Sequence, residues 1–250
     1  MVSTLDTFKK NIESVQKLIN FDREVLDMAI GSIRDLHSKL IQPPYSIDNE
    51  KSNGKRTLDN LTNIRNNDSL KSRFSIINNQ AVVLLVSYFG AAIADLFRAA
   101  SKIAIEVHKD KRVLNTELKI KVDELLVYGT SLGDTIGDML IAKNNISFQD
   151  MKSIKREFEK YFGIKIDKDQ TVNNIILGQA CRHSIAHEAG IVNTRVLNQI
   201  KSALPRELKE YLKEGEAIAF TEAEIKIVSD SMDSYVSKLQ NQVIAYSSST

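Results

Sequence analysis

The sequence predicts an all-α protein, a helical bundle of about five core helices with an inserted arm. Helix-breaking residues are sparse, because the 250 residues include only 10 Gly and 3 Pro, and Trp is absent. Apolar residues recur at steps of three and four near both ends of the chain, which is the period of one helix face. The length suits a single domain spanning residues 1–250 with a substantial core.

The composition limits the classes of partner. Lys and Arg (34) nearly balance Asp and Glu (32), so no polyanion-binding tail is indicated, and an RNA partner would be held by a local patch. The single cysteine, Cys181, rules out an internal disulfide framework and fits a reducing compartment. Residues 1–6 show no apolar signal region, and the most apolar run, residues 81–94, is too short to cross a bilayer alone. We therefore expect a cytoplasmic protein that does not span a membrane.

The first predicted helix covers residues 5–40. Asp22 and Ala29 are the only interruptions in an apolar seam whose spacing is typical of a long helix packed lengthwise against another helix. Pro43 and Pro44 end this helix. The seam consists of Leu5, Phe8, Ile12, Val15, Ile19, Leu26, Ile33, Leu36 and Leu40.

Residues 42–73 are rich in Asn, Asp and Ser and show no sustained period. We expect a polar surface insertion here, with at most a short helix over residues 58–64. Its basic residues are candidates for weak RNA binding, although a solvated loop explains them too and the aromatic residues of a single-strand platform are missing. These candidates are Lys51, Lys55, Arg56, Arg65, Lys71 and Arg73.

The middle of the chain predicts further helices. Residues 75–107 are apolar nearly all round in their first half, which indicates the central core helix. Asp95 follows this apolar run and is a candidate supporting residue for the site described below, although it can also pair with Arg98 for structure alone. Another helix is expected over residues 115–128, with Leu118, Val122, Leu125 and Leu126 facing inward. Asp134 and Asp138, four residues apart, could hold a metal or do acid–base work, or could cap and solvate a short helix.

The later elements show clear boundary signals. Ser147 and Asp150 form a capping-box pattern before a helix that Gly163 ends. Pro205 breaks a helix over residues 195–203, residues 216–220 alternate like a short extended segment, and Thr221 and Glu224 form a second capping box. The last helix carries an apolar stripe that pairs with the first helix or with a second subunit, and the stripe consists of Ile225, Val228, Met232, Tyr235, Leu239 and Val243.

The chemistry-bearing residues lie in a helix that begins after Asp169 or Thr171 and ends near Ala189, where Gly190 can adopt the left-handed closing conformation. Arg182 supplies a fixed cation, and His183 and His187 supply groups that titrate near neutrality. His187 is expected in the last turn, where the helix C-terminus favours its imidazolium form. This combination suits phosphodiester chemistry.

Two other interpretations of these side chains remain open. Arg182 and His187 can be a surface cation and a packed histidine. His183 and His187 can bind zinc, because they lie four residues apart on one helix face. The metalloprotease form of that spacing, however, has a glutamate directly after the first histidine, and this chain has Ser184 there.

The run 182–193, Arg-His-Ser-Ile-Ala-His-Glu-Ala-Gly-Ile-Val-Asn, resembles the Arg-(polar)-x-x-x-His signature of the HEPN superfamily. The resemblance is to the branch found in bacterial and phage-conflict RNases, where a glycine, an aliphatic residue and a polar residue follow the histidine. Members related to nucleotidyltransferase toxin–antitoxin pairs carry a tyrosine two residues past the histidine, and this chain has Ala189 at that position.

The resemblance implies a metal-independent endoribonuclease without a cofactor, in a toxin or phage-defence setting, restrained by an antitoxin or another neutralising protein. A ribose 2′-hydroxyl would attack the adjacent phosphate and leave a 2′,3′-cyclic phosphate. His187 would act as general base or acid, Arg182 would neutralise the phosphate, and His183 would orient or assist. The alternative functions are a non-catalytic helical interaction or RNA-binding module that retains the motif, and a zinc protein.

The resemblance also implies a homodimer, and helix geometry agrees with it. Five helical residues turn about 500°, which leaves Arg182 and His187 roughly 140° apart around the helix axis. Two motif helices that cross near a two-fold axis can bring the arginine of one chain to the histidine of the other. The alternative is a monomer in which the long Arg182 side chain reaches His187, with Asp95 or another core residue completing the site.

Overall fold

The computed structural model describes residues 3–43, 53–66, 71–121, 123 and 131–248. Within these residues no β-strand is found, and the isolated bridge between Ile191 and Ala217 is the only β-pairing. The predicted all-α class is therefore confirmed. The helices are α1 (Thr4–Leu40), α2 (Asn53–Asn66), α3 (Lys71–Glu106), α4 (Lys111–Leu114), α6 (Leu132–Lys143), α7 (Met151–Phe162), α8 (Gln170–His187), α9 (Thr194–Ile200) and α10 (Glu222–Ser248).

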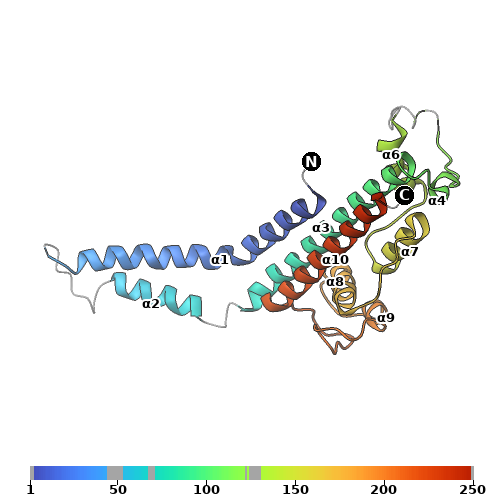
Figure 1. The fold of residues 1–250 in the computed structure, drawn as a ribbon. Helices are drawn as coiled ribbons and strands as arrows, with labels where there is room; N and C mark the ends of the chain where they lie inside the picture. Colours follow the sequence, from blue (N-terminus) through green and yellow to red (C-terminus); the bar gives the residue numbers. More distant parts are fainter. Residues whose placement is uncertain (1–2, 44–52, 67–70, 122, 124–130, 249–250) are drawn as a thin grey trace.

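Helix α3 is the central helix, as its all-round apolar pattern predicted. It packs against α1, α6, α8 and α10, and α10 runs beside it over much of its length (Figure 1). Phe97 of α3 is fully buried and meets four other aromatic rings with centroids 5.1–5.7 Å away. Such edge and tilted ring contacts stabilise the core beyond the burial of apolar area. The rings belong to Phe148, Phe158, Tyr161 and Phe162.

By length and composition alone, the stretch Ile76–Glu106 of α3 is long and apolar enough to cross a membrane. This apolar stretch is therefore longer than the run of residues 81–94 that was expected from the sequence. In this structure the stretch lies among α1, α6, α8 and α10. A helix buried by several neighbours has the same all-round apolar composition.

Helix α1 packs against different helices in its two halves and does not form one continuous seam. In its first half, Phe8, Ile12 and Val15 are buried, and α1 packs against α3 and α10, which confirms that the first and last helices pair. Its second half extends away from the bundle with α2 alongside it (Figure 1). There Ile30 is buried, but Leu36, a member of the predicted seam, is 59% exposed. The apolar spacing predicted the length of α1. It did not predict at which point along α1 the contacts with α3 and α10 end.

The inserted arm is more helical than predicted. We expected at most a short helix over residues 58–64, whereas α2 covers Asn53–Asn66 and α3 begins at Lys71. Contacts with α1 stabilise α2, and Arg65 forms an ion pair with Asp27 of α1 (Nε to Oδ1, 2.5 Å). Helices of this length are marginal alone, so the packing on α1 explains what the periodicity did not reveal.

The predicted helix over residues 115–128 is not found in the first part of this range, whereas Asp123, the one other described residue of the range, is helical. Asp110 caps the four-residue helix α4, and residues 116–121 have no regular secondary structure. Leu118 still packs against the core, as predicted. The other predicted inward residues, Val122, Leu125 and Leu126, lie outside the described residues.

The capping signals of the later helices are largely correct. Thr221 and Glu224 exchange the reciprocal bonds of a capping box, and Gly163 ends α7 with a φ of 69°. The cap of α7 is Asp150, which accepts a hydrogen bond from the Ser153 N–H at 2.8 Å, so α7 begins three residues later than a Ser147 cap would place it. All six residues of the predicted α10 stripe are buried: Ile225, Val228, Met232, Tyr235, Leu239 and Val243.

Candidate functional site

Helix α8 carries the Arg182–His187 motif and is held at both ends. Asp169 caps its start by accepting from the Val172 N–H at 2.9 Å, as predicted. The helix ends at His187, two residues earlier than expected, because Ala189 and Gly190 both adopt positive φ angles of 54° and 71°. His187 thus lies in the last turn, and the Gly190 N–H donates to the Ser184 carbonyl at 3.0 Å. This bond closes the helix end.

The segment after α8 is tied to the rest of the bundle. The buried Ser184 hydroxyl donates to the Ile191 carbonyl, and the Ile218 N–H donates to the Gly190 carbonyl at 2.7 Å. Asn79 of α3 holds the same strand-like segment, because its amide donates to the Ile218 carbonyl at 2.7 Å. The last turn of α8 therefore has a defined position relative to α3.

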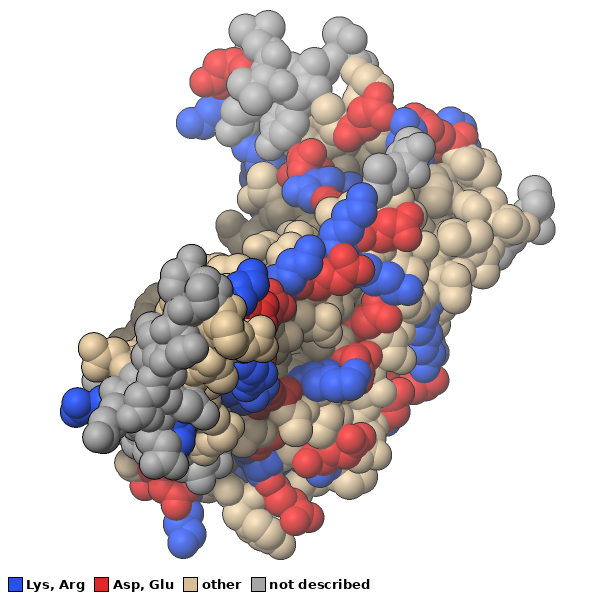
Figure 2. Space-filling view, turned by 90° about the vertical axis from the view of Figure 1, so that its left-hand side faces the viewer, with Lys and Arg blue, Asp and Glu red and all other residues tan. Residues whose placement is uncertain are grey.

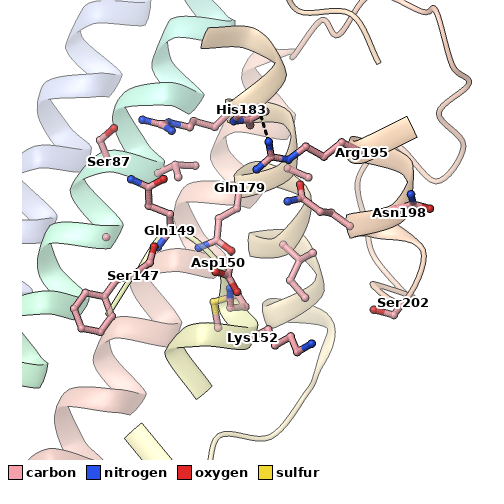
Figure 3. Close-up of a pocket in the computed structure, with 18 of the residues that line it drawn as sticks. Ser87, Ser147, Gln149, Asp150, Lys152, Gln179, His183, Arg195, Asn198 and Ser202 are labelled. Atoms are coloured by element: carbon pink, nitrogen blue, oxygen red, sulfur yellow. Dashed lines mark hydrogen bonds between the residues drawn. The ribbon is translucent and has the colours of Figure 1, made fainter. Parts of the chain in front are cut away.

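Arg182 lines a cavity of about 840 Å³ between α3, α7, α8 and α9 (Figure 3). In the described part of the chain its side chain has no hydrogen-bond or ion-pair partner, and its Nε is buried without one. A guanidinium is always charged at neutral pH, so an unpartnered one beside a cavity favours an anionic ligand. The volume falls within the range of small-molecule and nucleotide pockets.

His183 lies at the same cavity and is engaged by Arg195 of α9 (Figure 3). The Arg195 Nη1 lies 3.0 Å from the His183 Nε2, and because the guanidinium can only donate, the imidazole must accept with this nitrogen. Partial desolvation, followed by the positive charges of Arg195, His187 and Arg182, lowers the pKa of His183, and Glu188 opposes this shift. His183 is thus held in its neutral form near pH 7.

His187 has a different position from its two neighbours. It is exposed and does not line the cavity, whereas Arg182 and His183 do. Its ring centroid lies 5.0 Å from that of His183. The structure therefore groups Arg182, His183 and Arg195 at the cavity and leaves His187 beside them on the surface.

Several residues around the cavity were not anticipated from the sequence. Arg195 follows the α9 cap Asn193, whose side chain accepts from the Val196 N–H at 2.9 Å. The sequence contains this N-cap signal, but the signal does not predict that the Arg195 side chain turns back to His183, twelve positions earlier. Gln179 of α8, together with Asn198 and Gln199 of α9, also lines the cavity.

Asp95 is not brought to this site. Its carboxylate accepts from Arg98 at 2.8 Å, and Arg98 also donates to Asp138 of α6 at 2.7 Å. Asp95 does not line the cavity. Asp134, the partner of Asp138 in the sequence pattern, forms an ion pair with Lys102 of α3. These carboxylates join α3 to α6.

The predicted basic patch lies on the arm and not at the cavity (Figure 1). Lys55, Arg56 and Arg65 belong to α2, and Lys71 and Arg73 belong to the first turn of α3, with side chains outside the described residues. Lys51 also lies outside the described residues. On the face shown in Figure 2, the described Lys and Arg side chains are interspersed with Asp and Glu. This mixture agrees with the near-neutral net charge of the chain.

Two further chemical features can be judged from the geometry. Cys181 is fully buried in α8, and this burial raises the pKa of its thiol to about 12, which makes it an inert packing residue. Among the described residues, no group of three or more His, Cys, Asp or Glu side chains could hold a metal ion.

Comparisons of the chain with protein-family models, with curated proteins and with solved structures gave no significant match.

Proposed function

We propose that this chain is a metal-independent endoribonuclease that cleaves RNA through 2′-hydroxyl attack. The observation that carries the proposal is the unpartnered Arg182 guanidinium, which lines a cavity beside the neutral His183 and one helical turn from the exposed His187. A fixed cation for a phosphate and imidazoles that can carry protons are the groups that such a reaction needs. The resemblance of residues 182–193 to HEPN ribonucleases supports the same reaction.

In the proposed reaction, His187 takes the proton of the ribose 2′-hydroxyl, and the resulting oxygen attacks the adjacent phosphorus. The bond from phosphorus to the 5′-oxygen breaks, and that oxygen receives a proton from the imidazolium. The products are a 2′,3′-cyclic phosphate and a 5′-hydroxyl, and no water or metal is consumed. Arg182 stabilises the extra negative charge on the phosphate, while Arg195 keeps His183 neutral and oriented at the cavity.

We further propose that two chains share each site in a homodimer. Arg182 lines the cavity and His187 does not, in keeping with the roughly 140° between these positions on one helix. In a two-fold dimer with paired α8 helices, the His187 of a second chain would reach the phosphate held by Arg182. The protein would act in the cytoplasm as a toxin or phage-defence effector restrained by a neutralising protein.

The test is cleavage of a defined RNA, followed by analysis of the new 3′ ends. We expect 2′,3′-cyclic phosphate ends, no effect of EDTA, and no cleavage where 2′-deoxyribose replaces the ribose at the cleavage site. His187→Ala and Arg182→Ala should each lower the rate by about 10² or more with unchanged helical content.

Matched control variants are available on α1. His37→Ala and the exposed Arg23→Ala remove a histidine and an arginine from other surfaces and should cleave normally. Wild-type rates in His187→Ala would end the assignment. Activity lost on chelation and restored by zinc would favour the zinc protein, and RNA binding without cleavage would favour the non-catalytic RNA-binding module.

A further inference from the structure

The cavity beside Arg182 is much larger than one phosphate requires. His183 and Arg195 lie together in one part of its wall (Figure 3), and the remainder is formed by α3, α8, α9, the loop before α7 and the first residues of α7. That remainder is partly apolar and carries amide side chains together with the charged residues Asp150 and Lys152, a mixed composition that suits an organic group with polar edges. Its apolar members are Val86, Gly90, Ala91, Phe148, Met151, Ile176 and Ala180.

Gln179 gives this pocket a defined hydrogen-bonding character. Only 8% of the residue is exposed, and its Oε1 accepts from the Met151 N–H at 3.0 Å. An N–H can be satisfied only by the oxygen of the amide, so this bond fixes which way the Gln179 amide is turned. Figure 3 shows the side chain pointing from α8 towards the loop around Asp150, within the cavity wall. The Gln179 Nε2 is left as a donor.

The Gln179 Nε2 is buried and has no partner in the described part of the chain. The same is true of the Arg182 Nε, one turn further along α8. Both residues line the cavity, and residues three apart lie on one helix face. A buried donor without an acceptor is unfavourable. The cavity wall therefore contains two buried donors that lack an acceptor.

We propose that this cavity binds a nucleobase of the RNA and selects bases with a keto oxygen, guanine or uracil, over bases with an amino group, adenine or cytosine. The inference rests on the proposed ribonuclease function, because it is the phosphate at Arg182 that brings a base to this wall. A keto oxygen accepts from the Gln179 amide nitrogen, whereas an amino group would place two donors against each other. A correctly paired base edge gives roughly tenfold or greater discrimination.

The experiment measures binding to the wild-type chain by fluorescence anisotropy, using short RNAs that cannot be cleaved because every ribose carries a 2′-O-methyl group. Two pairs of RNAs differ at a single base: inosine against adenosine, and uridine against cytidine. Each pair exchanges a keto oxygen and the adjacent ring N–H for an amino group and a bare ring nitrogen, and leaves the rest of the base unchanged. We expect inosine and uridine to bind about tenfold more tightly than their partners.

Gln179→Glu tests the residue itself. The carboxylate still accepts from the Met151 N–H but replaces the donor by an acceptor, so the keto preference should disappear or reverse. Asn78→Asp is the matched control, since Asn78 is also 8% exposed and its amide bonds the Phe220 carbonyl, away from the cavity. Asn78→Asp should keep the preference. Equal binding of inosine and adenosine, or an unchanged preference in Gln179→Glu, overturns the proposal.

A second pair of variants serves if Gln179→Glu does not fold. Ala91 is exposed at the cavity rim, and Ala99 is exposed on the same helix outside the cavity. Ala91→Phe should block the pocket and abolish the preference, and Ala99→Phe should retain it. Preference retained in Ala91→Phe overturns the proposal.

The two proposals fail in different ways. If ordinary RNA is cleaved but the chain shows no keto preference in binding, the base-pocket proposal is wrong and the ribonuclease proposal stands. If the chain shows a keto preference in binding but does not cleave ordinary RNA, the base-pocket proposal stands and the ribonuclease proposal is wrong. Failure of all four RNAs to bind overturns the base pocket.

Discussion

His183 and His187 lie four residues apart on α8, yet their surroundings assign them different chemistry. His183 accepts a hydrogen bond from Arg195 and has a lowered pKa, so it remains neutral. His187 is exposed in the last turn of α8, outside the cavity. A proton carrier must release and regain its proton within each cycle, and His187 is the imidazole to which the proposed reaction gives that role.

Replacing Arg195 by Gln should raise the pKa of His183. The neighbouring positive charge is the second cause of the lowered pKa, after desolvation, and Gln removes that charge while it keeps a donor. NMR titration of the imidazole Cε1–H resonance measures the change, and Lys152→Gln at the opposite side of the cavity is the control. An unchanged pKa in Arg195→Gln would contradict this account.

The sign of the pH dependence follows from the same shift. The folded chain binds the His183 proton more weakly than the unfolded chain does, since the folded pKa lies below the ordinary value of 6.5. This contribution to stability is therefore fully present above pH 6.5 and is lost as the pH falls towards the folded pKa.

Asp110 provides a second residue-scale prediction. Burial acts to raise its pKa, but hydrogen bonds from Arg112 and Tyr246 outweigh burial and lower the pKa to about 2. Asp110→Asn keeps an oxygen that can cap α4 and loses the charge. With Arg112 about half exposed, we expect a loss of about 1 kcal/mol in the free energy of unfolding at pH 7.

The pH dependence of this loss is the sharper measurement. A carboxylate with a depressed pKa stabilises the fold above its unfolded pKa, here 3.8, and the effect is lost as the pH falls through about 2. Urea unfolding should thus show the wild type and Asp110→Asn converging between pH 4 and 2. Asp230→Asn, at an exposed pair with Lys226, should show little difference at any pH.

At the scale of elements, the end of α8 is the joint on which the site depends. The helix stops at His187 because the backbone turns left-handed at Ala189 and Gly190, and the turn then joins the segment at Ile218. Only the last turn separates this joint from Arg182. A change in the closing conformation therefore displaces the imidazole of His187 before it affects the buried start of the helix.

Gly190→Ala should destabilise the fold by about 1–2 kcal/mol, because a side chain is strained at a φ of 71°. No steric clash adds to this, since the nearest atom to an added Cβ, on Asn79, is 3.9 Å away. Gly190→Asn should cost less, as Asn tolerates this conformation. Urea unfolding compares the variants, with Gly215→Ala as a second positive-φ site in open surroundings. Equal stability of Gly190→Ala and Gly190→Asn would refute the strain argument.

At the scale of the whole molecule, α3 connects three groups of helices. It packs against α1 and α10 along the bundle, against α6 through ion pairs, and against α7 and α8 where the cavity forms. The arm of α1 and α2 extends away from these contacts (Figure 1). The cavity thus lies among packed helices of the bundle and not on the arm, which is the placement that a preorganised site requires.

The shared site predicts complementation between two inactive variants. In a mixed dimer, a His187→Ala chain supplies Arg182 and an Arg182→Ala chain supplies His187, so one of the two sites is intact. Random refolding of an equal mixture should restore about a quarter of wild-type activity, because half of the dimers are mixed. No recovery, with sedimentation as a monomer, would exclude the dimer.

The sequence by itself determined the elements that depend on local patterns. The helical period predicted α1, α3 and α10, and the caps at Asp169, Gly163 and Thr221 located helix ends, because these signals involve residues only a few positions apart. It also determined that Arg182 and His187 share one helix. Each of these properties is encoded within one or two helical turns.

Tertiary structure decided what depends on distant contacts. Helix α2 forms along α1, Arg195 turns back to His183, and Arg98 of α3 pairs with Asp138 of α6. No periodicity or short spacing in the sequence predicts these pairings, because each one joins segments that the packing of other helices brings together in space. The same packing leaves the Gln179 nitrogen without a partner in the cavity wall, a property that only the folded chain possesses.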